Sequence, residues 1–566
     1  MTLLSFALRA DRLRLVIALA ASVASGFAGA ALMGYIGRQF TSQDNLGPLT
    51  IVAFAALIVF SVGAGLAARW LLVELVSLRT LKLQMELSRR IVVTPLPQVE
   101  AIERARLFAV LTDDARAVSD ALMRIPEVVI STALVAGSIA YLLWLSPLAA
   151  SVLVLVAVPV VLFYRRLNRR VARLLKVFFR VRDERYGQYD GLTMGTKELQ
   201  VDPSLRSRFV EAMGTKGELF RRTHARVLLA HEVANTWSQA AYFVFVLVLL
   251  VLIRSDVVGG DILGAYALIA LYIRGAIVQI TAVIPVWVQA NTALARIDSL
   301  DLAPDPGEDS LGRSPAADVA EVSDVSAGDE IVIRAEQLSF RYPTPDGYGF
   351  GLEPIDLEMR SGELIFITGG NGSGKTTLMK LLCALYEPSG GTLSCNGEPV
   401  VWDGAADDRD AYRQRISALF ADGYLFEELL GMDDQSADGT EAANRFLAEL
   451  DLADKVEVVD GHLSTTALST GQRRRLALLG AFLRDRQVYA FDEWAANQDP
   501  IFKRFFYRTL LPELRRRGKL VLVISHDDAY FDGADRILQL SEGRLDAVIV
   551  PSASSASASA GPSTSS

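Results

Sequence analysis

Residues 363–377 read ELIFITGGNGSGKTT, and this stretch decides the fold of the second half of the chain. Its first six residues, with the apolar run LIFI at 364–367, are typical of a buried strand, and a glycine-rich loop then leads into an apolar helix. The loop matches GxxxxGK followed by Ser or Thr, in the strand, loop and helix context that this pattern requires. It predicts a phosphate-binding loop, whose backbone N–H groups point into one concavity at a helix N-terminus. A chance glycine-rich turn is the alternative, and the flanking context disfavours it.

Two side chains of this loop carry the expected chemistry. Lys375 would supply a positive charge to the β- and γ-phosphates, and the Thr376 hydroxyl would ligate Mg²⁺. The loop therefore implies ATP and Mg²⁺ as ligands. The candidate ATP-binding residues of the loop are Gly369, Gly370, Asn371, Gly372, Ser373, Gly374, Lys375, Thr376 and Thr377.

A second strand pattern, residues 488–491, ends in the acids Asp492 and Glu493. Ligands bind at the carboxyl ends of strands in parallel sheets, so we expect both acids to lie beside the phosphate-binding loop. We predict that Asp492 holds the Mg²⁺ shell and that Glu493 is the base that polarises the attacking water. Two acids at a strand end are often only a solvated edge, but the loop upstream favours catalysis.

Working outward from these motifs, composition divides the chain into four parts. Residues 331–548 alternate short β-branched runs with amphipathic stretches, which predicts an α/β domain with a mostly parallel sheet. Residues 301–330 are acidic and rich in Pro, Gly, Ser and Ala, and we interpret them as a linker. Residues 549–566 form a Ser/Ala tail of low complexity, which predicts disorder. Residues 1–300 hold most of the apolar sequence.

The first 300 residues predict a membrane domain. The chain has 566 residues, of which 51% are hydrophobic, and a mean hydropathy of +0.29, which nearly excludes a purely soluble protein. A bilayer core requires roughly 20 apolar residues of helix. The predicted six spans are residues 15–36, 49–68, 128–145, 148–164, 237–253 and 262–288.

Charge indicates orientation and excludes one class of partner. Basic residues gather before the first span and in the two long loops after spans two and four, which places both termini in the cytoplasm. The net charge of −8 argues against nucleic acid as the main partner. The only two cysteines, Cys383 and Cys395, exclude a disulfide framework and suit a reducing compartment.

Residues 468–472 read LSTGQ and precede three arginines. This segment resembles the signature of ATP-binding cassette (ABC) proteins, with Thr470 where Gly is usual. In that family Ser469 and Gly471 cap the γ-phosphate held by the opposite subunit, and Gln472 completes the motif. An ordinary serine helix cap is the alternative. The resemblance covers residues 331–548, and six spans are consistent with its exporter branch.

The same resemblance assigns roles to three further residues. His526 matches the switch histidine that contacts the γ-phosphate, and Asp499 matches the aspartate that couples two sites. Tyr342 occupies the position of the aromatic that stacks on adenine, although a core tyrosine is a fair alternative. Ala421 departs from the family, because a glutamine is usual there. The neighbouring Asp422 is a candidate substitute as a metal ligand.

A narrower resemblance concerns the cargo. Residues 491–500 (FDEWAANQDP), 511–514 (LPEL) and 524–528 (ISHDD), with TDD at 112–114 and GTKEL at 195–199, resemble the bacterial branch that exports cyclic peptides and siderophore precursors, of pyoverdine or syringomycin type. In exporters these two cytoplasmic loops dock on the ATPase domain. The resemblance implies export of a cyclic or acylated peptide across the bacterial cytoplasmic (inner) membrane.

Because a signature segment completes the site of the other subunit, we expect a homodimer with two composite ATP sites. The expected architecture is a six-span transmembrane domain fused to an ABC ATPase domain. Arg274, near the middle of the sixth span, is a candidate for binding an anionic part of the peptide, and Thr281 shares its helical face. Local pairing or snorkelling of Arg274 is the alternative. A lipid or multidrug exporter, or a membrane sensor with a regulatory cassette, are the competing functions.

Overall fold

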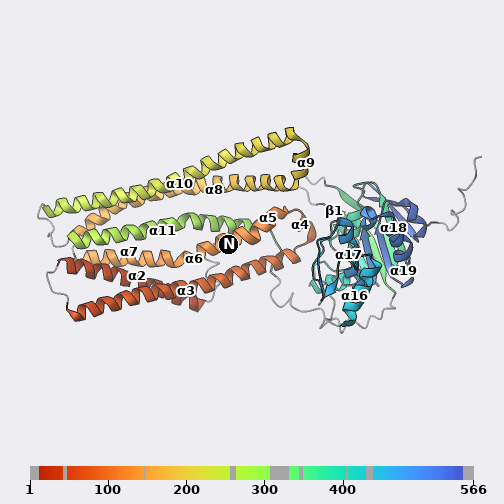
Figure 1. Ribbon diagram of the computed structural model, residues 1–566, viewed down its shortest axis with the longest axis horizontal. Coiled ribbons are helices and arrows are strands. Elements are labelled where there is room, and N and C mark those ends of the chain that lie inside the picture. Colours follow the sequence, from red (N-terminus) through yellow and green to blue (C-terminus); the bar gives the residue numbers. More distant parts are fainter. Residues whose placement is uncertain are drawn as a thin grey trace, which may run out of the picture. The chain divides into compact units, whose positions relative to one another are not determined.

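A computed structural model describes residues 12–41, 47–145, 147–254, 263–305, 330–342, 349–402, 406–428, 437–459 and 461–551 (Figure 1). The chain divides into two compact units. Unit 1 comprises Met1–Val92 and Ile102–Asp305, and unit 2 comprises Val93–Ala101 and Pro306–Ser566. Most of the predicted linker, residues 306–329, and the tail from 552 lie outside the described residues.

Unit 1 is helical throughout its described part (Figure 1). The described residues of each of the six apolar segments predicted from the sequence lie in a long helix, namely α2, α3, α7, α8, α10 and α11, and residue 262 lies outside the described residues. The helices of unit 1 are α2 (Arg12–Thr41), α3 (Pro48–Val93), α5 (Arg104–Ala109), the π-helix η1 (Val110–Asp114), α6 (Ala115–Met123), α7 (Ile125–Leu145), α8 (Pro147–Met194), α9 (Thr196–Val201), α10 (Pro203–Arg254) and α11 (Leu263–Asp298).

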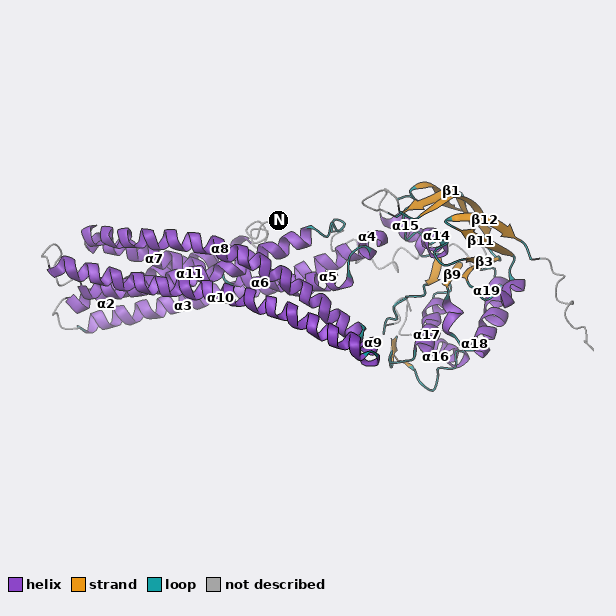
Figure 2. Ribbon diagram, turned by 90° about the horizontal axis from the view of Figure 1, so that it is seen from above, coloured by secondary structure: helices purple, strands orange, loops and turns teal. Residues whose placement is uncertain are grey.

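Small residues allow α2 and α7 to pack closely. A Cβ added at Gly26 would lie 2.5 Å from the carbonyl oxygen of Ile130, so only glycine fits there. The Tyr141 hydroxyl donates to the carbonyl oxygen of Gly34 at 2.9 Å across the same pair of helices. Helices α8 and α10 also lie side by side along their lengths (Figure 2).

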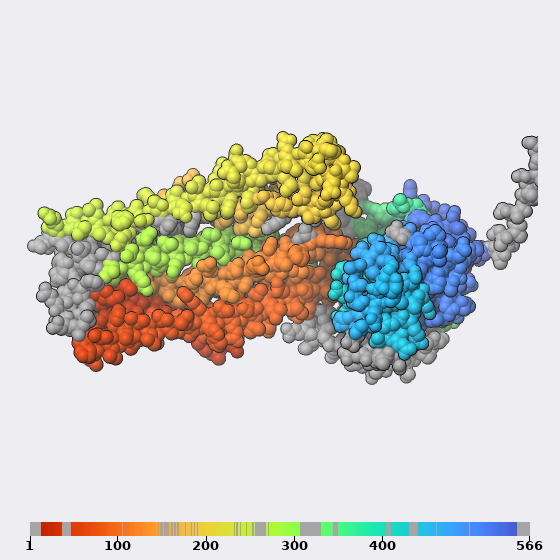
Figure 3. Space-filling view, in the orientation of Figure 1, coloured from red at the N-terminus to blue at the C-terminus, as the bar shows by residue number. Residues whose placement is uncertain are grey.

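The outer surface of unit 1 is apolar. Along α3, the lower red-to-orange edge in Figure 3, Leu49, Val59 and Trp70 are 84%, 71% and 67% exposed. Among the described residues, four helices are long and apolar enough to cross a membrane: Leu13–Ile36, Pro48–Val93, Arg106–Trp144 and Leu271–Asp298. Exposed apolar side chains of this kind suit contact with lipid. Unit 1 therefore has the character of a transmembrane domain, while the number of six spans remains a prediction.

Unit 2 is built on a six-stranded sheet in the order β12-β11-β3-β10-β9-β6 (Figure 2). All neighbours in it are parallel except β11 and β12, in agreement with the predicted mostly parallel sheet. A second sheet, β2-β1-β4-β5, is antiparallel, and β7 pairs with β8. The strands are β1 (Val332–Arg341), β2 (Gly351–Arg360), β3 (Leu364–Gly369), β4 (Gly390–Cys395), β5 (Glu398–Pro399), β6 (Ile416–Leu419), β7 (Val458–Val459), β8 (His462–Leu463), β9 (Val488–Asp492), β10 (Leu520–Ile524), β11 (Arg536–Ser541) and β12 (Arg544–Ile549).

The main sheet of unit 2 is buried on both faces, one of them packed against α14 (Lys375–Leu382) and the antiparallel sheet, which explains why its central strands are continuously apolar. Successive residues of β3 enter different cores: Ile365 and Ile367 pack in one, and Leu364 and Phe366 in the other. A strand buried on both faces carries apolar side chains at every position. The helices are α4 (Leu96–Glu100), α14 (Lys375–Leu382), α15 (Ala406–Arg413), α16 (Ala437–Glu449), α17 (Thr470–Leu483), η3 (Trp494–Asn497), α18 (Pro500–Phe505), η4 (Phe506–Leu510), α19 (Leu511–Arg516) and η5 (Asp528–Gly533).

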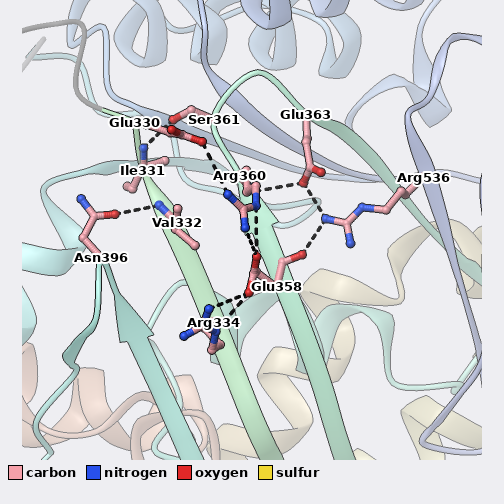
Figure 4. A network of polar contacts seen from close by, with 10 residues as sticks. All are labelled: Glu330, Ile331, Val332, Arg334, Glu358, Arg360, Ser361, Glu363, Asn396 and Arg536. Carbon is pink, nitrogen blue, oxygen red and sulfur yellow. Dashed lines mark hydrogen bonds and ion pairs between the residues drawn. The ribbon is translucent and has the colours of Figure 1, made fainter.

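A polar network joins the two sheets of unit 2 (Figure 4). Glu358 of β2 accepts hydrogen bonds from Arg334 of β1 and from Arg360, at 2.7 and 2.5 Å. Arg536, which begins β11 of the main sheet, donates to the carbonyl oxygen of Glu358 at 2.7 Å and to the Glu363 carboxylate at 2.5 Å. These contacts fix the antiparallel sheet against the strand that leads into the glycine-rich loop. The remaining members of the network are Glu330, Ile331, Val332, Ser361 and Asn396.

Candidate active site

The loop between β3 and α14 has a backbone that only glycine adopts easily. Gly369 has φ 144°, and a Cβ there would lie 2.1 Å from the carbonyl oxygen of Leu540. Lys375 is buried, and its Nζ donates to the carbonyl oxygens of Gly369 and Gly370 at 3.0 and 2.9 Å. The Ser373 Oγ is buried and has no hydrogen-bond partner in the part of the chain that the structure describes. A phosphate oxygen would satisfy both groups, so the loop fits a bound nucleotide phosphate.

Asp492 lies within reach of the loop. Its carboxylate oxygens are 3.1 and 3.4 Å from the Thr376 Oγ1. Burial raises the pKa of Asp492, the hydrogen bond from Thr376 opposes this shift, and the negative charges of Glu493 and Asp422 add to it. A bound cation would relieve this unfavourable ionisation. Thr376 and Asp492 supply the oxygen ligands that Mg²⁺ prefers, and phosphates and waters provide the rest in sites of this kind.

Glu493 and His526 meet at the ends of neighbouring strands. Asp492 of β9 is in register with Ile524 of β10, and the Glu493 N–H donates to the carbonyl oxygen of Ile524 at 3.1 Å. His526 Nε2 lies 3.3 Å from Glu493 Oε1, and both side chains are partly exposed. The two predicted catalytic side chains therefore lie together, at the edge of the sheet that carries the loop. Solvent access suits a base that activates water.

The segment LSTGQ begins helix α17. Ser469 is its N-cap: its Oγ accepts from the Gln472 N–H at 3.3 Å, and the Gln472 Oε1 accepts from the Ser469 N–H at 3.1 Å. The Gly471 carbonyl oxygen accepts a bond from Gln498 Nε2 at 3.1 Å. This capping box orders the segment at a helix N-terminus, a position suited to an anion. Contact of Ser469 and Gly471 with the nucleotide of a second subunit remains a prediction.

Asp499 caps the next helix and contacts the signature helix. Its Oδ1 accepts from the Phe502 N–H at 2.9 Å, and this backbone bond lowers the pKa of Asp499. Arg475 of α17 forms an ion pair with the same carboxylate and lies over the Phe502 ring, 4.2 Å from its centroid. The two motifs are thus joined within one chain.

Tyr342 follows β1 and packs against the core of unit 2. Its hydroxyl lies 3.2 Å from the Thr377 Oγ1 and 3.4 Å from the Tyr386 hydroxyl, and its ring meets those of Phe340 and Tyr386 edge-on. The interpretation as a core tyrosine has direct support in these contacts. Stacking on adenine remains a prediction from the family resemblance.

The segment that departs from the family lies beside Glu493. Ala421 and Asp422 are exposed, and the carbonyl oxygen of Ala421 accepts from Arg474 Nη2 at 3.0 Å. Arg474 is a site residue that the sequence did not single out beyond its place in a basic triplet. Its other contacts reach the backbone of Glu493 and Trp494.

A second residue missed from sequence, Glu100, lies in α4. Its carboxylate accepts from Lys380 Nζ at 2.7 Å and from the Tyr386 hydroxyl at 2.5 Å. Leu96 of the same helix packs against the core around Tyr386. No local pattern marks Glu100, because its partners are distant in sequence.

The two predicted loop motifs lie in helical segments of unit 1. Thr112 to Asp114 lie in η1, where Asp114 is buried, and Gly195 to Leu199 lie at the start of α9.

The two candidate substrate residues lie on α11. Arg274 is half-buried, and its Nε is buried with no hydrogen-bond partner among the described residues. Thr281 is also half-buried, and its Oγ1 donates to the carbonyl oxygen of Val278 at 2.9 Å. Arg274 therefore retains a donor for a ligand, whereas the Thr281 hydroxyl proton is used within its own helix.

Comparison with known proteins agrees with this geometry. A family model described as "ABC transporter" matches residues 352–496. The chain is 33% identical to the ATP-binding protein SyrD of Pseudomonas syringae pv. syringae, over 92% of this chain and 91% of that protein. It is 32% identical to the ATP-dependent lipid A-core flippase of Ralstonia nicotianae, over 38% of this chain and 37% of that protein. It is 28% identical to the ABC transporter BEA3 of Gibberella fujikuroi, over 39% of this chain and 17% of that protein.

Proposed function

This chain belongs to the ABC transporter family, and from that premise we propose that two copies of it form an ATP-driven exporter of a cyclic or acylated peptide. Its ATPase activity is coupled to transport, as membership of the family entails. The proposed location is the bacterial cytoplasmic membrane, with six spans per chain and both termini in the cytoplasm. A siderophore precursor or similar secondary metabolite is the proposed cargo.

One chain contains half of each ATP site. The loop at Gly369 to Thr377 and the segment at Ser469 to Gln472 occur once each. In ABC proteins such segments meet across a dimer interface, which supports a homodimer with two composite sites. ATP would bind the closed dimer far better than the open one, and only such a difference in affinity can drive the membrane helices between two states.

The proposed hydrolysis uses the side chains gathered around the loop. Lys375 and Ser373 bind the phosphates, and Thr376 and Asp492 hold Mg²⁺, which when bound neutralises charge on the phosphates. Glu493 accepts a proton from the attacking water, and His526, 3.3 Å away, donates to the γ-phosphate. The pairing of Glu493 with His526 beside an intact loop is the observation that carries this proposal.

Two observations favour a peptide as cargo. The motifs at 491–500, 511–514 and 524–528 resemble the peptide-exporting branch. The unsatisfied Nε of Arg274 suits a carboxylate or another anionic group. We propose that Arg274 faces the substrate path, with Thr281 in a lesser role.

Lipid export is the second candidate. Several relatives are named lipid A-core flippases, but each matches less than two fifths of this chain. A lipid phosphate would also satisfy Arg274, so the residues alone do not separate the two cargoes. The motifs at 491–500, 511–514 and 524–528, which resemble the peptide-exporting branch, make peptide export the better proposal.

The test is uptake of a labelled acylated or cyclic peptide into inside-out membrane vesicles. We expect ATP-dependent uptake with the wild-type chain and none with Glu493→Gln, which should retain bound ATP without turnover. Steady-state ATPase close to wild type in Glu493→Gln would overturn the assignment of the base. Lack of peptide uptake, together with lipid- or drug-stimulated ATPase, would leave the ATPase intact and overturn the cargo.

A further inference from the structure

Helix α17 carries three consecutive arginines, and each has a different environment. Arg473 is exposed, Arg475 pairs with Asp499, and Arg474 reaches back toward the candidate base. The Arg474 Nη1 donates to the carbonyl oxygens of Glu493 and Trp494 at 3.1 and 3.4 Å. One guanidinium thus holds two successive peptide groups at the end of β9.

Trp494 returns this contact. Its indole Nε1 donates to the carbonyl oxygen of Arg474 at 3.0 Å. The Trp494 side chain is buried, and its ring lies 4.6 Å from that of Phe506 and 5.9 Å from that of Phe502. The tryptophan therefore acts as a fixed anchor, because its ring is packed and its only polar atom is bonded to α17.

The backbone held in this way is an uncommon one. Glu493 has φ 47° and ψ 32°, in the left-handed region that residues other than glycine rarely occupy. Such a conformation persists only where the surroundings determine it. The hydrogen bonds from Arg474 and the packing of Trp494 both act on the backbone at this position, and the direction of the Glu493 side chain depends on that backbone.

The third contact of Arg474 reaches the segment that departs from the family. Its Nη2 donates to the carbonyl oxygen of Ala421 at 3.0 Å. A glutamine is usual at position 421 in the family, but Ala421 has no polar side chain with which to bond to the site. Instead, the main-chain carbonyl of Ala421 accepts a hydrogen bond from Arg474, which also bonds to the main-chain carbonyl of Glu493.

We infer that Arg474 is a positioning residue, which links the backbone at Ala421 to the backbone of Glu493 and thereby sets the orientation of the base. This inference rests on the proposed role of Glu493. It predicts that loss of Arg474 slows hydrolysis while ATP still binds, because Lys375, Ser373 and Thr376 are untouched. Misplacing a catalytic group by about 1 Å costs on the order of a hundredfold in rate.

The experiment measures kcat and KM for ATP of the purified full-length protein in proteoliposomes. Arg474→Met keeps the length of the side chain and removes all its donors. We expect its kcat to fall by roughly tenfold to a hundredfold while its KM for ATP stays near the wild-type value. Arg474→Lys, which can reach one carbonyl, should recover part of kcat, and Trp494→Phe should lower kcat less. Arg473→Met is the matched control on the same helix turn.

The outcomes separate this inference from the proposed base. Wild-type kcat in Arg474→Met, beside an inactive Glu493→Gln, would overturn the positioning role alone. Activity in Glu493→Gln would overturn the base and the inference together. A rise in KM that accounts for the whole loss would mean that Arg474 serves ATP binding. If Arg474→Met does not fold, equal kcat in Arg474→Lys, Trp494→Phe and wild type overturns the inference. Non-additive losses in the double variant Arg474→Lys/Trp494→Phe support it.

Discussion

The Glu100 carboxylate accepts a hydrogen bond from the Tyr386 hydroxyl at 2.5 Å, across 286 positions of sequence. Lys380 Nζ donates to the same carboxylate at 2.7 Å, and Lys380 lies on the helix that begins at the phosphate-binding loop. The Tyr386 hydroxyl also accepts from Tyr342 at 3.4 Å. A chain of polar contacts therefore leads from α4, which follows the long helix α3 in the sequence, to the candidate nucleotide site.

We expect Glu100→Ala to uncouple ATP hydrolysis from transport. The loss of Glu100 removes its bond to Lys380 of α14, the helix that begins at the phosphate-binding loop, and its bond to Tyr386, which follows that helix, while the loop itself is unchanged. Substrate-stimulated ATPase and vesicle uptake should fall severalfold, while basal ATPase stays near wild type. Glu100→Gln, which can still accept from Tyr386, should fall between the two. Glu103→Ala, at the residue before α5 in the segment that follows α4, is the control. Uptake at the wild-type rate in Glu100→Ala would contradict the coupling role.

The sequence predicted those features that depend on local pattern. The apolar run before Gly369 forms β3, and Asp492 contacts Thr376 of the loop, because the ends of parallel strands share one edge of a sheet. The length of the apolar runs likewise predicted the spans, and the described residues of each predicted span lie in a long helix. The family resemblance singled out His526, and its Nε2 lies 3.3 Å from Glu493 Oε1.

Contacts between distant segments could not be predicted in this way. Glu100 and Arg474 look like ordinary solvated charges, since nothing near them in sequence names Tyr386 or Ala421 as a partner. The role of Tyr342 shows the opposite limit, because its position matched a family motif while its hydroxyl bonds within the core. Polar contacts of this kind depend on the packing of whole elements, which a single sequence does not encode by spacing.

Thiol reagents should not inhibit the folded protein. Both cysteines are buried, and burial, with a smaller contribution from the charge of Asp492, raises the pKa of the Cys383 thiol to about 12. A raised pKa lowers the thiolate fraction, so at pH 8 about one Cys383 in ten thousand would be ionised. We expect mass spectrometry to show that N-ethylmaleimide labels neither cysteine at pH 8. ATPase activity should be unchanged by the same treatment. Labelling should appear in denaturant, and rapid labelling of Cys383 in the folded protein would refute its burial.

An ion pair between a buried aspartate and a half-buried arginine should contribute to the stability of unit 1. Asp114 in η1 is buried, and its Oδ1 lies 3.5 Å from Arg296 Nη2 of α11. Arg296 is 24% exposed, so water compensates part of its charge when Asp114 is removed, and we expect a cost of about 1 to 3 kcal/mol. Asp114→Ala should therefore lower the Tm of the purified protein by several degrees. Asp113→Ala, at an exposed neighbour, should leave the Tm unchanged. Equal Tm values for the two variants would show that the pair contributes little.

Arg274 provides the sharpest test of the cargo. Its Nε is buried on α11 without a partner among the described residues, and a charge in a membrane helix is costly unless a ligand or a partner compensates it. We expect Arg274→Ala to abolish stimulation of ATPase by an anionic peptide and to leave basal ATPase intact. Arg274→Lys should keep part of the stimulation, because the charge remains but the fork of donors is lost. The Thr281 hydroxyl bonds to the Val278 carbonyl oxygen, so Thr281→Ala should change the stimulation little.

Assays with the same peptide in amidated, uncharged form separate charge recognition from a general effect on the helix. If the amidated peptide stimulates the wild-type protein equally, Arg274 does not read an anionic group, and stimulation that persists in Arg274→Ala would remove it from the substrate path.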